Sequence, residues 1–175
     1  MTLAVLARQR VDAPKQRLAR LYDECRDDVY AYVASLLGDR SLAEDVTALA
    51  FERAFRRRRL FNSRRGSERA WLFGIARNAA LDELRRRRRS TVLVGDVPMD
   101  ASASTEEVEG VLRRVTVRAA LAGLTPRERE LIALKFHAGL SNPDIARVLG
   151  VSESNAGTLL HRTITKLRRA CDDQA

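Results

Sequence analysis

The sequence predicts an all-α protein of two small helical domains, and three observations support this fold class. Apolar residues recur at three- and four-residue spacing, which is the period of a helix that buries one face. Residues that start and stop helices flank these segments. No alternating apolar pattern is long enough to support a sheet. The chain of 175 residues has room for two such domains. We place them at residues 14–90 and 110–172, joined by a linker at residues 91–109.

An apolar stripe marks the first helix, which is expected to end where Gly38 can adopt a left-handed cap. The stripe consists of Leu18, Leu21, Tyr22, Cys25, Val29, Tyr32, Val33 and Leu36. The next helix is expected to begin at a capping box formed by Ser41 and Glu44. Its apolar face consists of Val46, Leu49, Ala50 and Ala54.

A polar loop at residues 62–67 precedes the third helix, for which Ser67 is the expected N-cap. This helix runs through Trp71 and Ile75 into the arginine run at residues 85–89. Because Trp71 and Ile75 lie one helical turn apart, we expect Trp71 to belong to the core rather than to a platform for stacking bases.

Charge divides the chain in the same way as periodicity. The formal net charge is +9, with a pI near 10.6, which suits an anionic partner. Residues 1–89 carry a net charge of +9, residues 90–109 carry −5 and residues 110–175 carry +5. Helical periodicity fails in the acidic segment, where Gly95 and Pro98 are typical of a linker. Two basic domains therefore flank an acidic tether.

Strong helix signals return in the C-terminal domain. Thr125, Pro126 and Glu128 combine an N-cap, a proline in the first turn and a glutamate at the third helical position. Further stops and N-caps are expected at Gly139, Ser141, Gly150 and Ser152. These signals predict a helix, a sharp turn and a final helix.

The final helix separates polar from apolar side chains. At about 100° per residue, one side carries Ala156, Leu160, Ile164 and Leu167. The other side carries Ser154, Asn155, Thr158, His161, Arg162, Thr165 and Arg169. Asparagine suits adenine, and arginine suits guanine or phosphate, so this face can read duplex DNA from the major groove. We favour this interpretation over that of an ordinary amphipathic surface helix.

The N-terminal domain offers a second basic surface. Its arginine runs lie at residues 56–59 and 85–89. Five consecutive arginines must wrap around a helix, which suits backbone phosphates better than base edges. Aromatic residues that could stack unpaired bases lie among these arginines: Phe55, Phe61, Trp71 and Phe73.

The sequence does not favour an enzyme or a membrane protein. His137 and His161 have no metal ligands at the required spacing, and Cys25 and Cys171 form no metal or disulfide framework. The sequence has no glycine-rich phosphate loop, and its serine, histidine and carboxylate residues form no catalytic motif. We therefore expect no catalysis, no cofactor, no metal and no small-molecule substrate. The opening MTLAVLARQR does not resemble a signal peptide, and no stretch approaches the roughly 18 apolar residues that span a bilayer. A cytoplasmic protein without membrane insertion is expected.

Three segments resemble a known family. AEDVTALAFERAF and AWLFGIARNAALDELRRRRR are similar to region 2 of the bacterial sigma factors of the extracytoplasmic-function group. LTPRERELIALKFHAGLSNPDIARVLGVSESNAGTLLHRTITKLRR is similar to region 4 of the same group. The resemblance covers residues from about 14 to 170 and preserves the order of the two regions.

The resemblance implies a dissociable subunit that binds core RNA polymerase, directs it to promoter DNA and is controlled by an anti-sigma factor. Residues facing the polymerase would be Asp45, Val46, Leu49, Phe51 and Ala54. Residues engaging the −10 element would be Phe61, Asn62, Ser63, Arg64, Arg77, Asn78, Arg85 and Arg86. The polar face of the final helix would read the −35 element, and the acidic linker would thread through the polymerase channel.

The chain departs from relatives at two places. Ala48 and Leu49 stand where relatives commonly have Gln-Glu, and Gly157 and Leu159 stand where many have Lys and Arg. A LuxR-like helix-turn-helix regulator is the alternative for the C-terminal domain, but its usual upstream sensory domain would not be helical and basic. A protein that binds nucleic acid or anionic membranes by charge alone would not need the segregated face of the final helix.

Overall fold

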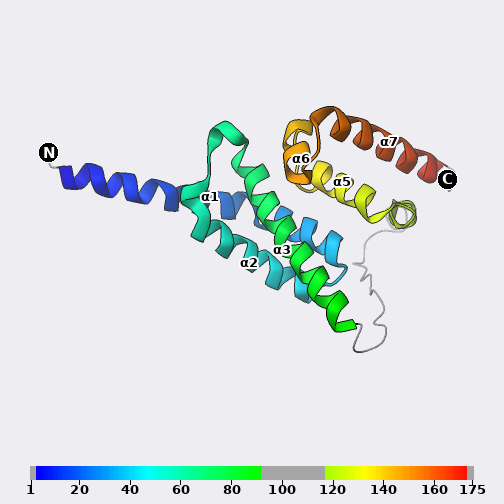
Figure 1. The fold of residues 1–175 in the computed structure, drawn as a ribbon, viewed down its shortest axis with the longest axis horizontal. Helices are drawn as coiled ribbons and strands as arrows, with labels where there is room; N and C mark the ends of the chain where they lie inside the picture. Colours follow the sequence, from blue (N-terminus) through cyan, green and yellow to red (C-terminus); the bar gives the residue numbers. More distant parts are fainter. Residues whose placement is uncertain (1–2, 92–116, 173–175) are drawn as a thin grey trace, which may run out of the picture.

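The computed structural model describes residues 3–91 and 117–172. Its regular elements are all helical, which confirms the predicted all-α class (Figure 1). They are α1 (Leu3–Leu37), α2 (Arg40–Arg57), η1 (Arg58–Leu60), η2 (Ser63–Arg65), α3 (Glu68–Thr91), α5 (Pro126–Phe136), α6 (Asn142–Leu149) and α7 (Glu153–Asp172). Residues 117–122 are also helical. The predicted linker lies outside the described residues apart from Thr91, which ends α3.

Helices α1, α2 and α3 pack against one another to form what we call the N-terminal bundle, residues 3–91 (Figure 1). Val29, Tyr32 and Val33 of α1 are fully buried, as the apolar stripe predicts. The Tyr32 ring meets Phe73 of α3 edge-on, with the ring centroids 5.4 Å apart. Tyr22 departs from the predicted stripe because it is exposed on the bundle surface.

Two of the three predicted helix boundaries in this bundle are correct. Gly38 has a φ of 67°, which ends α1 in the left-handed region. Ser67 accepts a hydrogen bond from the backbone N–H of Ala70, 3.1 Å away. The predicted capping box at Ser41 is wrong, because Asp39 accepts from the N–H of Leu42 at 3.0 Å and α2 begins at Arg40.

Helices α5, α6 and α7, with residues 117–124, make up what we call the C-terminal unit, residues 117–172. The predicted capping box of Thr125 and Glu128 is present at the start of α5. Ser141 and Ser152 cap α6 and α7 as predicted. Gly150, with a φ of 68°, makes the left-handed turn between these two helices.

The C-terminal unit packs directly against the N-terminal bundle. Helix α5 contacts α1, and α6 contacts α3 (Figure 1). One hydrophobic cluster of buried residues extends from Leu21 in α1 to Leu160 in α7. The two parts therefore share a core, although the sequence pattern describes them as separate domains.

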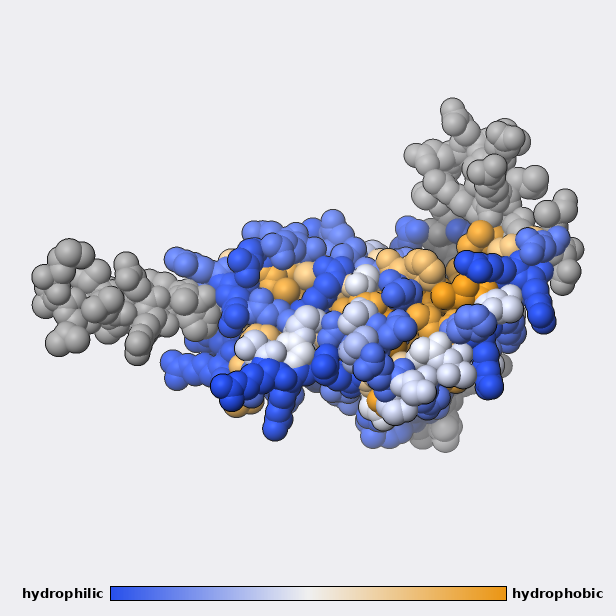
Figure 2. Space-filling model, turned by 90° about the horizontal axis from the view of Figure 1, so that it is seen from above, coloured by the Kyte–Doolittle hydropathy of each residue, from blue (hydrophilic) through white to orange (hydrophobic). Residues whose placement is uncertain are grey.

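The surface reflects the high content of charged residues. Seen from above the view of Figure 1, most of the described surface is hydrophilic, and apolar side chains gather in its middle (Figure 2). Large apolar side chains that remain exposed are Tyr22, Leu49, Phe55, Leu60, Val117 and Phe136.

Candidate nucleic-acid interface

Helix α7 presents the polar face that the sequence predicts. Its apolar side chains Ala156 and Leu160 are buried, which turns the opposite face outward. Of the seven predicted contact residues, six are exposed and Thr165 is half-buried. The two cationic members, Arg162 and Arg169, can reach phosphates or guanine edges. The geometry of α7 is thus compatible with insertion into a major groove.

An open groove of about 500 Å³ runs along part of this face. It is lined by His161, Arg162, Thr165, Lys166, Arg169 and Ala170. Lys166 donates to Glu128 of α5 at 2.8 Å, which ties the middle of α7 to the start of α5. That bond, followed by the backbone N–H of Thr125, lowers the pKa of the Glu128 carboxyl below its ordinary value.

Thr163 is a buried polar residue of α7 that belongs to neither predicted face of the helix. Its hydroxyl donates to the carbonyl of Leu159 at 2.8 Å, one turn earlier in the same helix. This local bond satisfies the hydroxyl inside the core. Thr163 therefore supports the buried side of α7 and has no place in the DNA-facing set.

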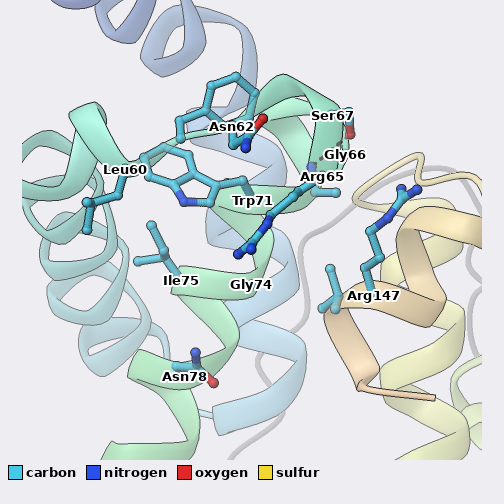
Figure 3. Close-up of a pocket in the computed structure, with 13 residues that line it drawn as sticks. Leu60, Asn62, Arg65, Gly66, Ser67, Trp71, Gly74, Ile75, Asn78 and Arg147 are labelled. Atoms are coloured by element: carbon cyan, nitrogen blue, oxygen red, sulfur yellow. Dashed lines mark hydrogen bonds between the residues drawn. The ribbon is translucent and has the colours of Figure 1, made fainter.

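The second candidate surface is a pocket of about 430 Å³ next to the loop that precedes α3 (Figure 3). Its lining residues are Leu60, Phe61, Asn62, Arg65, Gly66, Ser67, Ala70, Trp71, Gly74, Ile75, Asn78, Arg147 and Val148. Apolar and aromatic side chains lie beside amides and guanidinium groups. This combination suits an unstacked nucleobase, which has an apolar face and a hydrogen-bonding edge.

Trp71 occupies a position between core and surface. It is half-buried and packs against the hydrophobic core, yet it also lines the pocket. The Phe61 ring meets it edge-on, with centroids 5.6 Å apart. The guanidinium of Arg17 lies 5.1 Å from the Phe61 centroid, and Arg17 also pairs with Glu68. Trp71 therefore belongs to the core only in part, because it also lines the pocket.

Several predicted −10 residues are exposed in this region. Asn62, Ser63, Arg64 and Asn78 reach the surface near the pocket. Arg85 and Arg86 are exposed and paired within α3, to Asp82 at 3.4 Å and to Glu83 at 2.8 Å respectively. The two hydrogen bonds that the Arg86 guanidinium donates to the Glu83 carboxylate raise the pKa of Arg86 above its ordinary value.

Arg77 differs from these arginines because it is turned toward the C-terminal unit. Its Nε donates to Oε1 of Glu130 in α5 at 2.6 Å. Glu130 also accepts from Arg127 at 3.1 Å and from the Tyr32 hydroxyl at 3.3 Å. Burial, and then the nearby Glu130 charge, raise the pKa of Tyr32 well above its ordinary 10.0.

Arg69 makes a second link between the two parts of the molecule. Its Nε donates to the carbonyl of Ala138, between α5 and α6. The same guanidinium pairs with Asp28 of α1 and lies 3.1 Å from the Cys25 sulfur. Neither Arg69 nor Glu130 belongs to a motif or an apolar stripe that would predict these links from the sequence. The available signal was Glu130 itself, a carboxylate directly before the buried run at residues 131–134.

The predicted polymerase-facing residues of α2 divide into two groups. Asp45 and Leu49 are exposed. Val46, Phe51 and Ala54 are buried within the bundle, and Phe51 meets Tyr22 edge-on at 4.7 Å. A partner that docks on α2 would therefore touch the first group, while the second group holds the helix in position.

Within the described residues, no cluster of three or more histidine, cysteine or carboxylate side chains is arranged to hold a metal ion. The described helices include none that is long and apolar enough to cross a membrane.

Comparison with known families matches both parts of the chain. The Sigma-70 region 2 model matches residues 21–90, and the Sigma-70 region 4 model matches residues 114–167. The chain is 35% identical over 161 residues to the ECF RNA polymerase sigma factor BldN of Streptomyces coelicolor, covering 89% of this chain and 61% of BldN. It is 33% identical over 151 residues to the ECF RNA polymerase sigma factor SigL of Mycobacterium tuberculosis, covering 85% of each protein.

Solved structures show the same fold. The sigma factor RpoE of Bartonella quintana, crystallised with the anti-sigma factor NepR, superposes with a TM-score of 0.75 at 23% identity, covering 90% of this chain and 98% of that one. CnrH, in complex with the cytosolic domain of CnrY, superposes with a TM-score of 0.66 at 24% identity, covering 98% of this chain and 97% of that one.

Proposed function

The chain belongs to the extracytoplasmic-function RNA polymerase sigma factors, and on that premise we propose that it binds core RNA polymerase and directs it to promoters. One observation carries the proposal: the same molecule presents an exposed, polar recognition face on α7 and an aromatic, basic pocket beside α3. A reader of duplex DNA and a site for an unstacked base serve different steps of initiation. The LuxR-like alternative explains only the first of these surfaces.

The roles of the two parts follow from these surfaces. We assign −35 recognition to residues 110–172 through the polar face of α7. Recognition of the −10 element falls to residues 14–90, through the pocket, the loop before it and the basic side of α3. Base contacts on α7 specify sequence, whereas the arginines at the end of α3 hold backbone phosphates. Residues 91–109 connect the two.

Contact with polymerase is assigned to α2. Asp45 and Leu49 are its exposed members among the predicted set. The apolar Leu49 makes this contact less polar than the Gln-Glu pair common in relatives. Since polymerase carries out the chemistry, the chain needs no catalytic group of its own, and it acts in the cytoplasm where polymerase is found.

An anti-sigma factor is the further partner we propose. RpoE of Bartonella quintana was crystallised with the anti-sigma factor NepR, and CnrH with the cytosolic domain of CnrY. The superposition of both folds on this chain supports a partner of the same kind. Such a partner would mask α2, the pocket or the α7 face.

Runoff transcription with purified core polymerase on genomic fragments tests the function. We expect defined start sites only when the chain is added, and co-purification of the chain with core polymerase. Absence of both would overturn the proposal.

Arg162→Ala tests the assignment of α7 in the same assay. Loss of one base or phosphate contact is expected to lower initiation at −35-dependent promoters by about tenfold. Arg26→Ala is the control, because it removes one exposed charge from α1, far from α7 in sequence and paired locally with Asp27. Equal effects of the two substitutions, or an unchanged −35 preference in a randomised promoter library, would reject the role of Arg162.

A further inference from the structure

Glu130 lies where the C-terminal unit meets the N-terminal bundle. Its side chain is 7% exposed, and three donors converge on its carboxylate. Two of them, the Tyr32 hydroxyl and the Arg77 guanidinium, come from the bundle, while Arg127 comes from its own helix. A buried carboxylate is costly unless such donors surround it. The docked arrangement of the two parts therefore supplies the partners that Glu130 needs.

The same arrangement occupies Arg77. Its guanidinium is only 19% exposed and approaches both oxygens of Glu130, through Nε at 2.6 Å and Nη2 at 3.5 Å. A guanidinium that binds two oxygens of one anion recognises carboxylate and phosphate by the same geometry. Arg77 precedes the exposed Asn78, which lines the pocket. The Glu130 carboxylate thus stands where a DNA phosphate would bind Arg77 if a strand lay along α3.

A second carboxylate of the C-terminal unit meets the loop before α3. The hydroxyl of Ser67 lies 3.1 Å from Oδ2 of Asp144, at the start of α6. Arg147, also of α6, lies so close to Gly66 that a Cβ there would come within 3.2 Å of its Nη1. Arg147 and Val148 complete the wall of the pocket (Figure 3). Docking of the C-terminal unit therefore contacts the end of the loop, at Gly66 and Ser67, as well as Arg77.

We propose that Glu130 is an internal competitor for the DNA phosphate that Arg77 binds, so that docking of the C-terminal unit and binding of single-stranded DNA along α3 exclude each other. The inference rests on the proposed −10 role of α3. DNA binds only the undocked form, so its apparent affinity is reduced by the fraction of molecules that remain docked. Release of Glu130 to water or to another partner frees the phosphate site.

Glu130→Gln tests this competition in the full chain. It removes the negative charge and leaves Arg77 and Arg127 uncompensated in the docked form. Glu128→Gln is the matched control: the same change on the same helix, at a residue that pairs with Lys166 within the C-terminal unit. Glutamine also keeps the capping box at that position. A fluorescein-labelled oligothymidylate of roughly 12 nucleotides is the DNA probe, because phosphate contacts do not depend on sequence.

The expected result has two parts. Small-angle scattering should show a larger radius of gyration for Glu130→Gln than for the wild type and for Glu128→Gln. Fluorescence anisotropy should show roughly three- to tenfold tighter oligonucleotide binding for Glu130→Gln than for Glu128→Gln. Tyr32→Phe removes one donor to Glu130 and keeps the ring against Phe73, so it should shift both quantities in the same direction by less. It provides the test if Glu130→Gln fails to fold.

Other outcomes overturn the inference in distinguishable ways. An unchanged radius together with unchanged or weaker DNA binding shows that Glu130 does not compete, whatever runoff transcription says of the sigma function. Adding Arg77→Ala to Glu130→Gln should abolish the gain in affinity. If the gain persists, Arg77 is not the phosphate site, and the −10 role of this residue fails while the docked contact stands.

Discussion

The carboxylate of Asp39 accepts hydrogen bonds from two different helices, α2 and α3. One oxygen caps α2 through the N–H of Leu42, and the other accepts from Arg87 of α3 at 2.6 Å. The hydrogen bond from Leu42, followed by that from Arg87, lowers the pKa of this carboxyl below its ordinary 3.8. A single residue thus joins the start of one helix to the end of another.

Asp39→Asn should therefore change how stability depends on pH. Because the folded-state pKa is depressed, the charge of Asp39 stabilises the fold fully above pH 3.8, and this contribution is lost as the pH falls through the lower folded-state value. Asparagine keeps the N-cap but carries no charge. Thermal unfolding followed by circular dichroism, from about pH 7 to about pH 2, should show a wild-type advantage that closes only at the acid end. A gap that stays constant with pH would contradict this account.

At the scale of a helix, α7 is the proposed DNA-recognition helix, yet it has a glycine in its second turn, Gly157. Gly157 lowers helix propensity, yet the space around it does not require glycine: a Cβ would meet only Asn142 Nδ2, at 3.7 Å. Gly150 is the opposite case, since its φ of 68° favours glycine although the space around it is open. Backbone conformation therefore explains the glycine at position 150, whereas nothing in the structure explains the glycine at position 157.

Gly157→Ala is expected to raise the free energy of unfolding by about 1 kcal/mol. Gly150→Ala is expected to lower it by about 1 kcal/mol, because alanine is strained in the left-handed region. Urea unfolding of the two variants beside the wild type measures both shifts. Shifts of the same sign would show that helix propensity and backbone strain do not control these positions.

At the scale of the whole molecule, the described residues form one packed body with a shared core. The core cluster includes residues of α1, α2 and α3 as well as α5, α6 and α7. Arg69 and Glu130 add polar links across the contact, which leaves few ways to unfold one part while the other keeps its partners. Opening for promoter binding must therefore exchange these contacts for those with polymerase and DNA.

We expect the isolated chain to unfold in one cooperative transition. Differential scanning calorimetry should give a calorimetric enthalpy close to the van 't Hoff enthalpy. Arg69→Ala removes the hydrogen bond to the Ala138 carbonyl. In this variant the van 't Hoff enthalpy should fall below the calorimetric enthalpy, or two transitions should separate. Two resolved transitions in the wild type would mean that the contact between the parts is too weak to couple them.

Local chain chemistry was sufficient for most helix ends and for the orientation of α7. The caps at Thr125, Ser141 and Ser152 each depend on an N–H three residues away, and the α7 face depends on the 3.6-residue period. The start of α2 is also a local feature, but the sequence does not predict it. Asp39 and Ser41 both offer a side-chain oxygen for the N-cap, and the sequence pattern does not decide between them. The all-α fold class follows from the same local signals, which are the 3.6-residue apolar period and the helix caps.

The partner of Arg77 could not be read from the chain. Glu130 lies 53 residues away, and its pairing depends on how α5 docks against α1 and α3. In the sequence, Arg77 is one of many arginines suited to phosphate, and Leu49 is one of several leucines suited to a core. Burial separates them: Leu49 is exposed on α2, whereas Arg77 is held under α5. Helix ends follow from neighbours along the chain, but whether a charge is free to bind DNA depends on which distant surface packs against it.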